Sequence, residues 1–184
     1  MLAVVPVKGR DGAKTRLAPV LSPAERARLV LDMLGRVLVA CAEADAITGT
    51  LLVTPDPGVA PTGVDVLRDA GTGHADAVAE ALRDRRARGG VLVVMADCPL
   101  VRAESLDALA AAATPLALVP SRDGGVNALA LHPLNGFVPS FGVPVEMTLA
   151  AARAAGLDAA VIDDPLLALD VDSPEDYEAM LACL

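Results

Sequence analysis

Aromatic residues are almost absent from this sequence of 184 residues. It has no tryptophan, one tyrosine and two phenylalanines, although 54% of its residues are hydrophobic. A core built from this chain must therefore consist mainly of alanine, valine and leucine. The high apolar content excludes intrinsic disorder. A chain of this length can bury most of its surface without a disulfide or a metal, so we expect a single domain over residues 1–184.

Cysteines are few, and long apolar runs are missing. Cys41, Cys98 and Cys183 are odd in number and widely spaced, which fits neither a metal site nor a secreted disulfide framework. Reduced thiols in the cytoplasm are the simplest interpretation. The first residues lack the pattern of a signal peptide, and runs such as Val91–Ala96 are far below the ~20 residues that span a bilayer. The sequence thus predicts a cytoplasmic protein without a membrane segment.

Positive charge is scarce, and lysine is its rarest form. Lys plus Arg total 15 against 24 for Asp plus Glu, which gives a formal net charge of −9. A nucleic-acid-binding protein would show a basic face, so this balance argues against nucleic acid as a partner. The only lysines, Lys8 and Lys14, share one N-terminal segment with Arg10 and Arg16. In so acidic a chain, this local group of cations points to an anionic ligand.

Apolar strands alternate with amphipathic helices along the chain. Strands are expected at 2–7, 50–54, 64–67, 91–95, 116–120, 126–131, 159–162 and 167–171. Helices are expected over 23–44, 73–88, 103–113 and 145–155, with a final helix from 174 onward. Ser22 and Ser173 each precede a proline in a capping pattern that begins a helix. The alternation predicts an α/β sheet, in which ligands bind outside the carboxyl ends of the strands.

The loop after the first strand is the first candidate site. Gly9 and Gly12 would let backbone N–H groups approach an anion closely. Lys8, Lys14 and Arg16 would neutralise a polyphosphate through charge-assisted hydrogen bonds. The segment matches neither a Walker A loop nor a GxGxxG fingerprint. A solvated loop with unrelated basic residues is the simpler alternative.

Two carboxylates form the second candidate site. Asp97 directly follows the continuous apolar strand, at the edge where ligands bind, and Asp172 precedes the last helix. The same late segment contains further acids at Asp163, Asp164, Asp170 and Asp176. Mg²⁺ in phosphoryl chemistry is held by one or two carboxylates plus phosphate oxygens, a need that Asp97 with Asp172 would meet. The alternative is a polar strand end and a residue that merely flanks a helix cap.

Other signals are weaker. Cys98 is better explained as a small loop residue than as a nucleophile, because neither histidine is placed to pair with it. Gly71 and Gly73 precede a helix whose free N–H groups could contact a base or a phosphate, although a tight turn explains them almost as well. The glycine-rich segment before Asn127 is either a hairpin turn or part of a loop whose Asn127 contacts a substrate.

Several segments, taken in order, resemble a known family. The resemblance is carried by VPVK, AKTRLAPVLSPAER, ADCPL, RDGGVNAL, FG and LDVDSPED. Together they are similar to the phospholactate or phosphoenolpyruvate guanylyltransferases of deazaflavin coenzyme F(420) biosynthesis, over nearly the whole chain. More distant relatives include molybdenum-cofactor and sugar-phosphate nucleotidyltransferases. The resemblance implies a Rossmann-like, three-layer nucleotide-diphospho-sugar-transferase fold with a mixed, mainly parallel sheet.

The resemblance also implies a reaction and roles for particular residues. A phosphorylated three-carbon acid attacks the α-phosphorus of GTP with Mg²⁺ as cofactor, and pyrophosphate leaves; catalysis is positioning plus charge stabilisation. The matching positions imply metal binding by Asp97 and Asp172, triphosphate contacts from Lys8, Lys14 and Arg16, and acid contacts from Asn127 and Gly142. GTP and the acid are the implied partners, and a homodimer is as open as a monomer.

Three positions depart from the family pattern. A serine of the FGPxS segment is Val145 here, a histidine just beyond it is Thr148, and an asparagine of a GLNA-like loop is Ala75. The departures fall on the acid-binding half of the expected site. Two alternatives therefore stand beside the guanylyltransferase. One is a nucleotidyltransferase for another acceptor, such as a sugar phosphate or molybdopterin, and the other is a catalytically silent nucleotide-binding protein.

Overall fold

A computed structural model of the chain describes residues 1–9, 12–70, 73–134 and 136–184. Its strands are β1 (Leu2–Pro6), β2 (Gly49–Thr54), β3 (Asp65–Arg68), β4 (Val91–Val94), β5 (Leu116–Pro120), β6 (Val126–Leu131) and β7 (Ala159–Val161). Its helices are α1 (Pro23–Glu43), α2 (His74–Leu82), α3 (Ala103–Ala112), α4 (Val145–Ala154) and α5 (Pro174–Leu181). Short 3₁₀ turns, η1 (Thr15–Leu17), η2 (Pro57–Val59) and η3 (Arg85–Gly89), lie between them.

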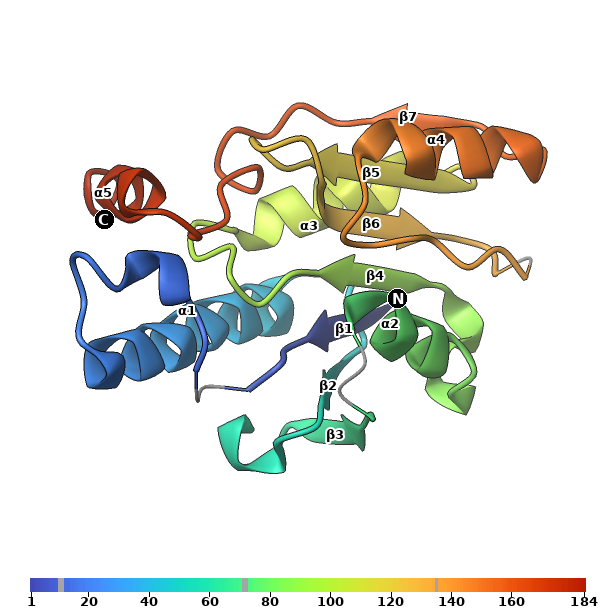
Figure 1. Cartoon of the computed structure of the whole chain (residues 1–184). Coiled ribbons are helices and arrows are strands. Elements are labelled where there is room, and N and C mark those ends of the chain that lie inside the picture. The colour runs from blue at the N-terminus through green and yellow to red at the C-terminus, as the bar shows by residue number, and fades with distance from the viewer. Residues whose placement is uncertain (10–11, 71–72, 135) are drawn as a thin grey trace.

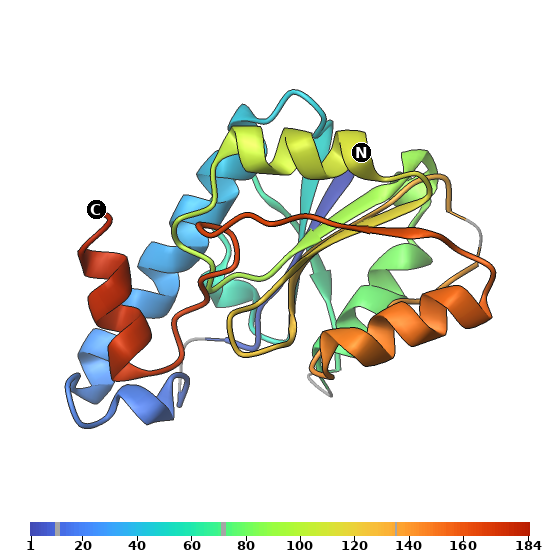
Figure 2. The same ribbon diagram turned by 90° about the horizontal axis from the view of Figure 1, so that it is seen from above.

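The strands form one mixed sheet in the order β3-β2-β1-β4-β6-β5-β7 (Figure 1). Strand β6 runs antiparallel to β4 and to β5, and the other neighbouring pairs are parallel. Helices α1 and α3 lie on one face of the sheet, and α2 and α4 lie on the other (Figure 2). This three-layer arrangement with a mainly parallel sheet confirms the fold predicted from the sequence.

The core has the composition that the shortage of aromatics predicted. Strands β1 and β4 are buried along their whole length, as expected where helices cover both faces of a sheet. Apart from Met33, the largest fully buried side chains are leucines. Within the described ranges, no helix combines the length and the apolar character needed to cross a membrane.

Both predicted helix caps are present. The Ser22 side chain accepts a hydrogen bond from the backbone N–H of Glu25, and the Glu25 carboxylate accepts one from the N–H of Ser22. Ser173 and Asp176 make the same reciprocal pair at the start of α5. Each cap satisfies backbone donors that the first helical turn leaves free. The second cap matters for function, because it holds the chain that carries Asp172.

The second helix is shorter than we predicted. The sequence pattern favoured a helix over 73–88, but α2 ends at Leu82 and the 3₁₀ turn η3 follows. The apolar spacing of the helix stops at Leu82, and the next buried residue among those described is Ala87.

The predicted strand over 167–171 is wrong. Leu167, Leu169 and Val171 are buried at alternate positions, which imitates a strand, but the segment is a turn and a loop without a ladder partner. Its backbone is held locally: the Asp164 carboxylate accepts hydrogen bonds from the N–H groups of residues 166 and 167. The N–H of Val171 then donates to the carbonyl of Asp97 at 3.1 Å. That bond brings the late acidic segment beside the end of β4.

Candidate functional site

A cavity of about 420 Å³ opens at the carboxyl ends of β1 and β4. Its lining includes Lys8, Gly9, Gly12, Lys14, His74, Asp97 and Asp172. The structure thus brings together the basic loop and both carboxylates that the sequence singled out. Gly9 has a φ of 113° and lies against Asp56, so the loop turns there in a conformation that favours glycine.

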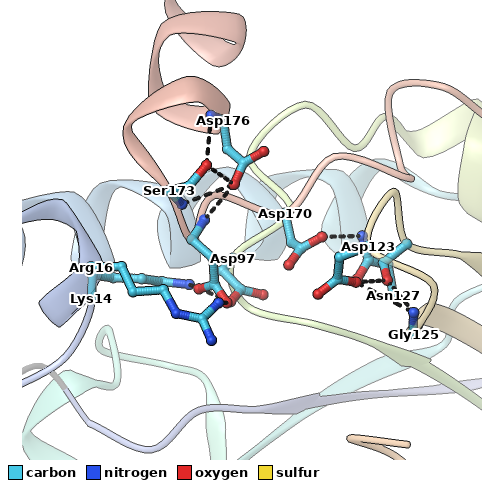
Figure 3. A network of polar contacts seen from close by, with 11 residues as sticks. Lys14, Arg16, Asp97, Asp123, Gly125, Asn127, Asp170, Ser173 and Asp176 are labelled. Atoms are coloured by element: carbon cyan, nitrogen blue, oxygen red, sulfur yellow. Dashed lines mark hydrogen bonds and ion pairs between the residues drawn. The ribbon is translucent and has the colours of Figure 1, made fainter. Parts of the chain in front are cut away.

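Lys14 is the centre of this site. Its ammonium group donates to Asp97 Oδ2 at 2.5 Å and to Asp172 Oδ1 at 2.7 Å (Figure 3). Its side chain is only 10% exposed. Burial alone would lower the pKa of Lys14, but Asp97 and Asp172 outweigh that effect and the pKa lies above its ordinary value. Lys14 therefore stays charged at neutral pH.

Three carboxylates gather around this point. Asp97, Asp170 and Asp172 each offer an oxygen, and the three oxygens lie within 4.8 Å of one another. Asp97 follows β4, whereas the other two belong to the loop that the Val171 hydrogen bond ties to Asp97. The backbone N–H of Asp172 donates to Asp176 at 3.2 Å, which connects the cluster to the cap of α5. Hard oxygen ligands so arranged are those that Mg²⁺ or Mn²⁺ takes.

Asp170 is the member of this cluster that sequence reasoning did not assign to the metal. Asn127 on β6 donates from Nδ2 to Asp170 Oδ1 at 3.1 Å and to the carbonyl of Leu167 at 3.2 Å (Figure 3). Burial raises the pKa of Asp170 to about 6, and the charges of Asp97 and Asp123 add to the rise, while the Asn127 hydrogen bond opposes it. The carboxylate is thus oriented for a cation that would offset its charge.

A signal for Asp170 is present in the sequence. In the run Leu167–Asp172, apolar and other residues alternate, and the apolar ones are buried. Alternation places Asp170 and Asp172 on the same side of the chain, opposite the buried side chains. The same pattern predicts a strand over 167–171, and from the sequence only Asp172 of these two acids is assigned to the metal.

The remaining predicted residues lie at different distances from the cluster. Arg16 approaches Asp172 at 3.8 Å with a side chain 75% exposed. Gly73 begins α2 and lines a small hollow with Lys8 and His74 beside the cavity. Gly142 is exposed in the turn before α4 and does not line the cavity. Gly71 lies outside the described residues.

Cys98 and His74 differ in what they can do chemically. Cys98 is fully buried, and burial raises the pKa of its thiol well above the ordinary value, as expected of a small loop residue rather than a nucleophile. His74 lines the cavity, and burial and the nearby charge of Lys8 lower the pKa of its imidazole. The carboxylate cluster itself offers cations and carboxylates and no nucleophile. That chemistry suits transfer of a phosphoryl-type group, in which charge stabilisation dominates.

Solved structures of other proteins share the fold of this chain. A nucleotide-diphospho-sugar transferase of Desulfovibrio desulfuricans G20 superposes with a TM-score of 0.78 at 17% identity, covering 97% of this chain and 85% of that one. The Rv0371c protein of Mycobacterium tuberculosis H37Rv, solved in complex with manganese, superposes with a TM-score of 0.60 at 18% identity, covering 100% and 98%. At these identities the likeness shows the fold.

The family is shown by sequence. A family model described as "Guanylyl transferase CofC like" matches residues 1–182. A phosphoenolpyruvate guanylyltransferase of Sphaerobacter thermophilus is 39% identical over 97% of this chain and 91% of its own. A 3-phospho-D-glycerate guanylyltransferase of Phenylobacterium zucineum is 36% identical (95% and 86%), and a 2-phospho-L-lactate guanylyltransferase of Haloarcula marismortui is 34% identical (98% and 85%). The chain belongs to the CofC-like guanylyltransferase family, which confirms the resemblance and the enzyme class.

Proposed function

We propose that this guanylyltransferase transfers GMP from GTP to a phosphorylated three-carbon acid, phosphoenolpyruvate first among them, and releases pyrophosphate in deazaflavin coenzyme F(420) biosynthesis. Relatives in the family are named for phosphoenolpyruvate, 3-phospho-D-glycerate or 2-phospho-L-lactate, and the relative that is 39% identical is named for phosphoenolpyruvate. The observation that carries the proposal is the meeting of the basic loop with Asp97 and Asp172 on one cavity, with the Asp170 carboxylate beside them. The unpaired thiols fit a reducing compartment, and we propose the cytoplasm.

The carboxylates fit a magnesium ion. Oxygens of Asp97, Asp170 and Asp172 converge within 4.8 Å, and burial is the main cause of the raised pKa of Asp170, to which the charge of Asp97 adds. These three residues would hold Mg²⁺, with Asn127 orienting Asp170. A bound magnesium ion would polarise the phosphate oxygens of GTP and stabilise charge that develops as the α-phosphorus is attacked.

The chain's own cations would act on the triphosphate. Lys8 and Lys14 line the cavity, and Arg16 stands at its rim beside Asp172. In the reaction, an oxygen of the acid's phosphate forms a bond to the α-phosphorus, and the bond to the bridging α–β oxygen breaks. Lys8, Lys14 and Arg16 would neutralise the leaving pyrophosphate. The attacking phosphate is already ionised near neutral pH, so the residues present need supply no general base.

The acid-binding half differs from the family pattern in a way the structure explains. Val145 is buried in the core at the start of α4, and its N–H donates to the carbonyl of Gly124 at 2.8 Å. Thr148 is also fully buried, and its hydroxyl donates to the carbonyl of Ser140 at 3.1 Å. The Thr148 side chain thus holds the segment that leads to Gly142, and the Val145 backbone holds the start of α4 to Gly124. The acid would therefore meet the backbone of this turn rather than a serine or a histidine.

A screen of acceptors tests the proposal. Pyrophosphate release from GTP is measured with phosphoenolpyruvate, 2-phospho-L-lactate, 3-phospho-D-glycerate and a sugar phosphate, each with Mg²⁺, and with ATP and CTP in place of GTP. We expect release with GTP and one of the three acids, with phosphoenolpyruvate best. Turnover with the sugar phosphate alone would refute the proposal, as would GTP binding without turnover on any acceptor.

The Asn127 side chain either orients Asp170 or contacts the acid, and the variant Asn127→Ala distinguishes these two roles. As the orienting partner of Asp170, Asn127→Ala should weaken Mn²⁺ binding by roughly 10- to 100-fold, a range found when outer-shell partners are removed. Metal affinity is measured by titration of the protein with Mn²⁺ at saturating GTP analogue. If the side chain instead contacts the acid, the KM for the acid rises while the Mn²⁺ affinity stays that of the wild type.

The turn at Gly142 can be tested against a matched glycine at the other end of α4. Gly142 and Gly156 have φ angles of 75° and 73°, and an added Cβ would meet no atom within 4 Å at either. Alanine at each position costs about 1–2 kcal/mol of backbone strain. We expect Gly142→Ala to raise the KM for the acid several-fold and leave the KM for GTP unchanged, whereas Gly156→Ala changes neither. Equal effects of the two variants on the KM for the acid would show that the turn at Gly142 does not contact the acid.

A further inference from the structure

The position of Lys14 poses a conflict with its expected role. Its ammonium hydrogen-bonds to both Asp97 and Asp172, at 2.5 and 2.7 Å, and these are two of the three carboxylates that converge for a metal. Each of these two carboxylates accepts a hydrogen bond from the ammonium through one oxygen, so a divalent ion bound to the same carboxylates would be repelled by the charge of Lys14. Two of the three N–H donors of the ammonium are used by the carboxylates, so full engagement of a triphosphate would draw Lys14 away from them.

The loop allows Lys14 to leave the carboxylates. Lys14 lies between β1 and η1, and the cavity that it lines is also lined by Lys8, Gly9 and Gly12. Its backbone is fixed by a hydrogen bond from the N–H of Leu17 to its carbonyl at 3.0 Å, so movement would be confined to the four-carbon side chain. Rotation of that side chain into the cavity would carry the ammonium from the carboxylates to a bound polyphosphate.

We propose that Lys14 is an exchangeable cation that occupies the carboxylates until the nucleotide binds, and that metal binding therefore depends on GTP. Without nucleotide, the ammonium competes with a divalent ion for Asp97 and Asp172. A bound triphosphate offers the ammonium another anionic partner, and the carboxylates become free for the metal. Because coupling between two ligands is reciprocal, the metal must strengthen GTP binding by the same factor. The exchange rests on the proposed function, which places the triphosphate in this cavity.

Binding of Mn²⁺ to the whole protein, followed by the electron paramagnetic resonance of free Mn²⁺, tests the exchange without any turnover. Lys14→Met keeps the length of the side chain and removes its charge. We expect Lys14→Met to bind Mn²⁺ about tenfold more tightly than the wild type without nucleotide, within the usual range of coupling factors. A non-hydrolysable GTP analogue should tighten Mn²⁺ binding to the wild type by a similar factor and to Lys14→Met by much less.

Lys8→Met is the matched control. Lys8 lines the same cavity, but among the described residues the lysine that donates to Asp97 and Asp172 is Lys14. The Lys8→Met substitution removes an equal charge and should leave nucleotide-free Mn²⁺ affinity within about twofold to threefold of wild type, as for a solvent-screened charge. A thermal melt gives a second measurement if Lys14→Met is less stable, since Mn²⁺ should then raise its Tm more than that of the wild type.

The exchange is overturned if Lys14→Met binds Mn²⁺ no more tightly than the wild type without nucleotide, or if Lys8→Met tightens it equally. Turnover of the wild type with GTP and an acid is measured first. If the wild type turns over and Lys14→Met has an unchanged Mn²⁺ affinity, only the proposed exchange is rejected. If no acid supports turnover of the wild type, the proposed function is rejected.

Discussion

Replacing Asp97 with asparagine is expected to lower kcat by roughly 100- to 1000-fold, the loss typical when one group that stabilises transition-state charge is removed. Asp97, like Asp172, belongs both to the Lys14 contact and to the carboxylate cluster. An amide of the same shape keeps the packing but removes the negative charge. The fold should survive, because Lys14 keeps Asp172 and the carbonyl of Asp97 still accepts from Val171. Pyrophosphate release at saturating GTP, acid and Mg²⁺ measures the loss.

Asp163→Asn is the control for this change. Asp163 is exposed and lies in the loop that leads to the cluster, so the substitution alters net charge equally without touching the site. We expect its kcat to equal that of the wild type. If Asp97→Asn kept more than about a tenth of wild-type kcat, a loss of under 1.4 kcal/mol in transition-state stabilisation, Asp97 would not be a metal ligand.

The meeting of the basic loop and Asp97 at one edge of the sheet could be predicted because its signals are local. Lys8, Gly9 and Lys14 lie close together in sequence, and the scarcity of lysine elsewhere makes them conspicuous. Asp97 follows a strand whose continuous apolar run marks it as central in a parallel sheet. The carboxyl ends of such strands meet at one edge, so a local pattern was enough to bring Asp97 to the basic loop.

The roles of Asp170 and Asn127 could not be predicted in the same way. Their hydrogen bond joins residues far apart in the chain, and it exists only because β6 inserts antiparallel between β4 and β5. The sequence pattern gave no order for the strands. The burial of alternate residues from Leu167 to Val171 comes from packing of the loop, and a strand produces the same pattern. The sequence pattern also did not show that α2 ends at Leu82, where its apolar spacing stops.

Asp170→Asn is expected to make the metal-free protein more stable and the enzyme inactive. The pKa of Asp170 in the folded protein is about 6, against 3.8 ordinarily, with burial as the main cause. The folded state therefore holds a proton that the unfolded state has lost between these pH values, and the stability of the wild type falls as pH rises through that window. Asparagine cannot ionise, and it can still accept the hydrogen bond from Asn127.

The gain should be fully present above pH 6 and vanish as pH falls below about 4, where Asp170 is protonated in both states. Because the Asp170 carboxylate is partly exposed, solvent screening limits the expected gain in the free energy of unfolding to about 1 kcal/mol. Urea unfolding in EDTA at pH 7.5 and pH 4 measures it, with exposed Asp158→Asn as the control for charge. If Asp170→Asn were less stable than the wild type at pH 7.5, the ionised carboxylate would not lower the free energy of unfolding. A gain in stability together with a loss of Mn²⁺ binding would mean that the charge of Asp170 lowers the stability of the folded protein and is required for metal binding.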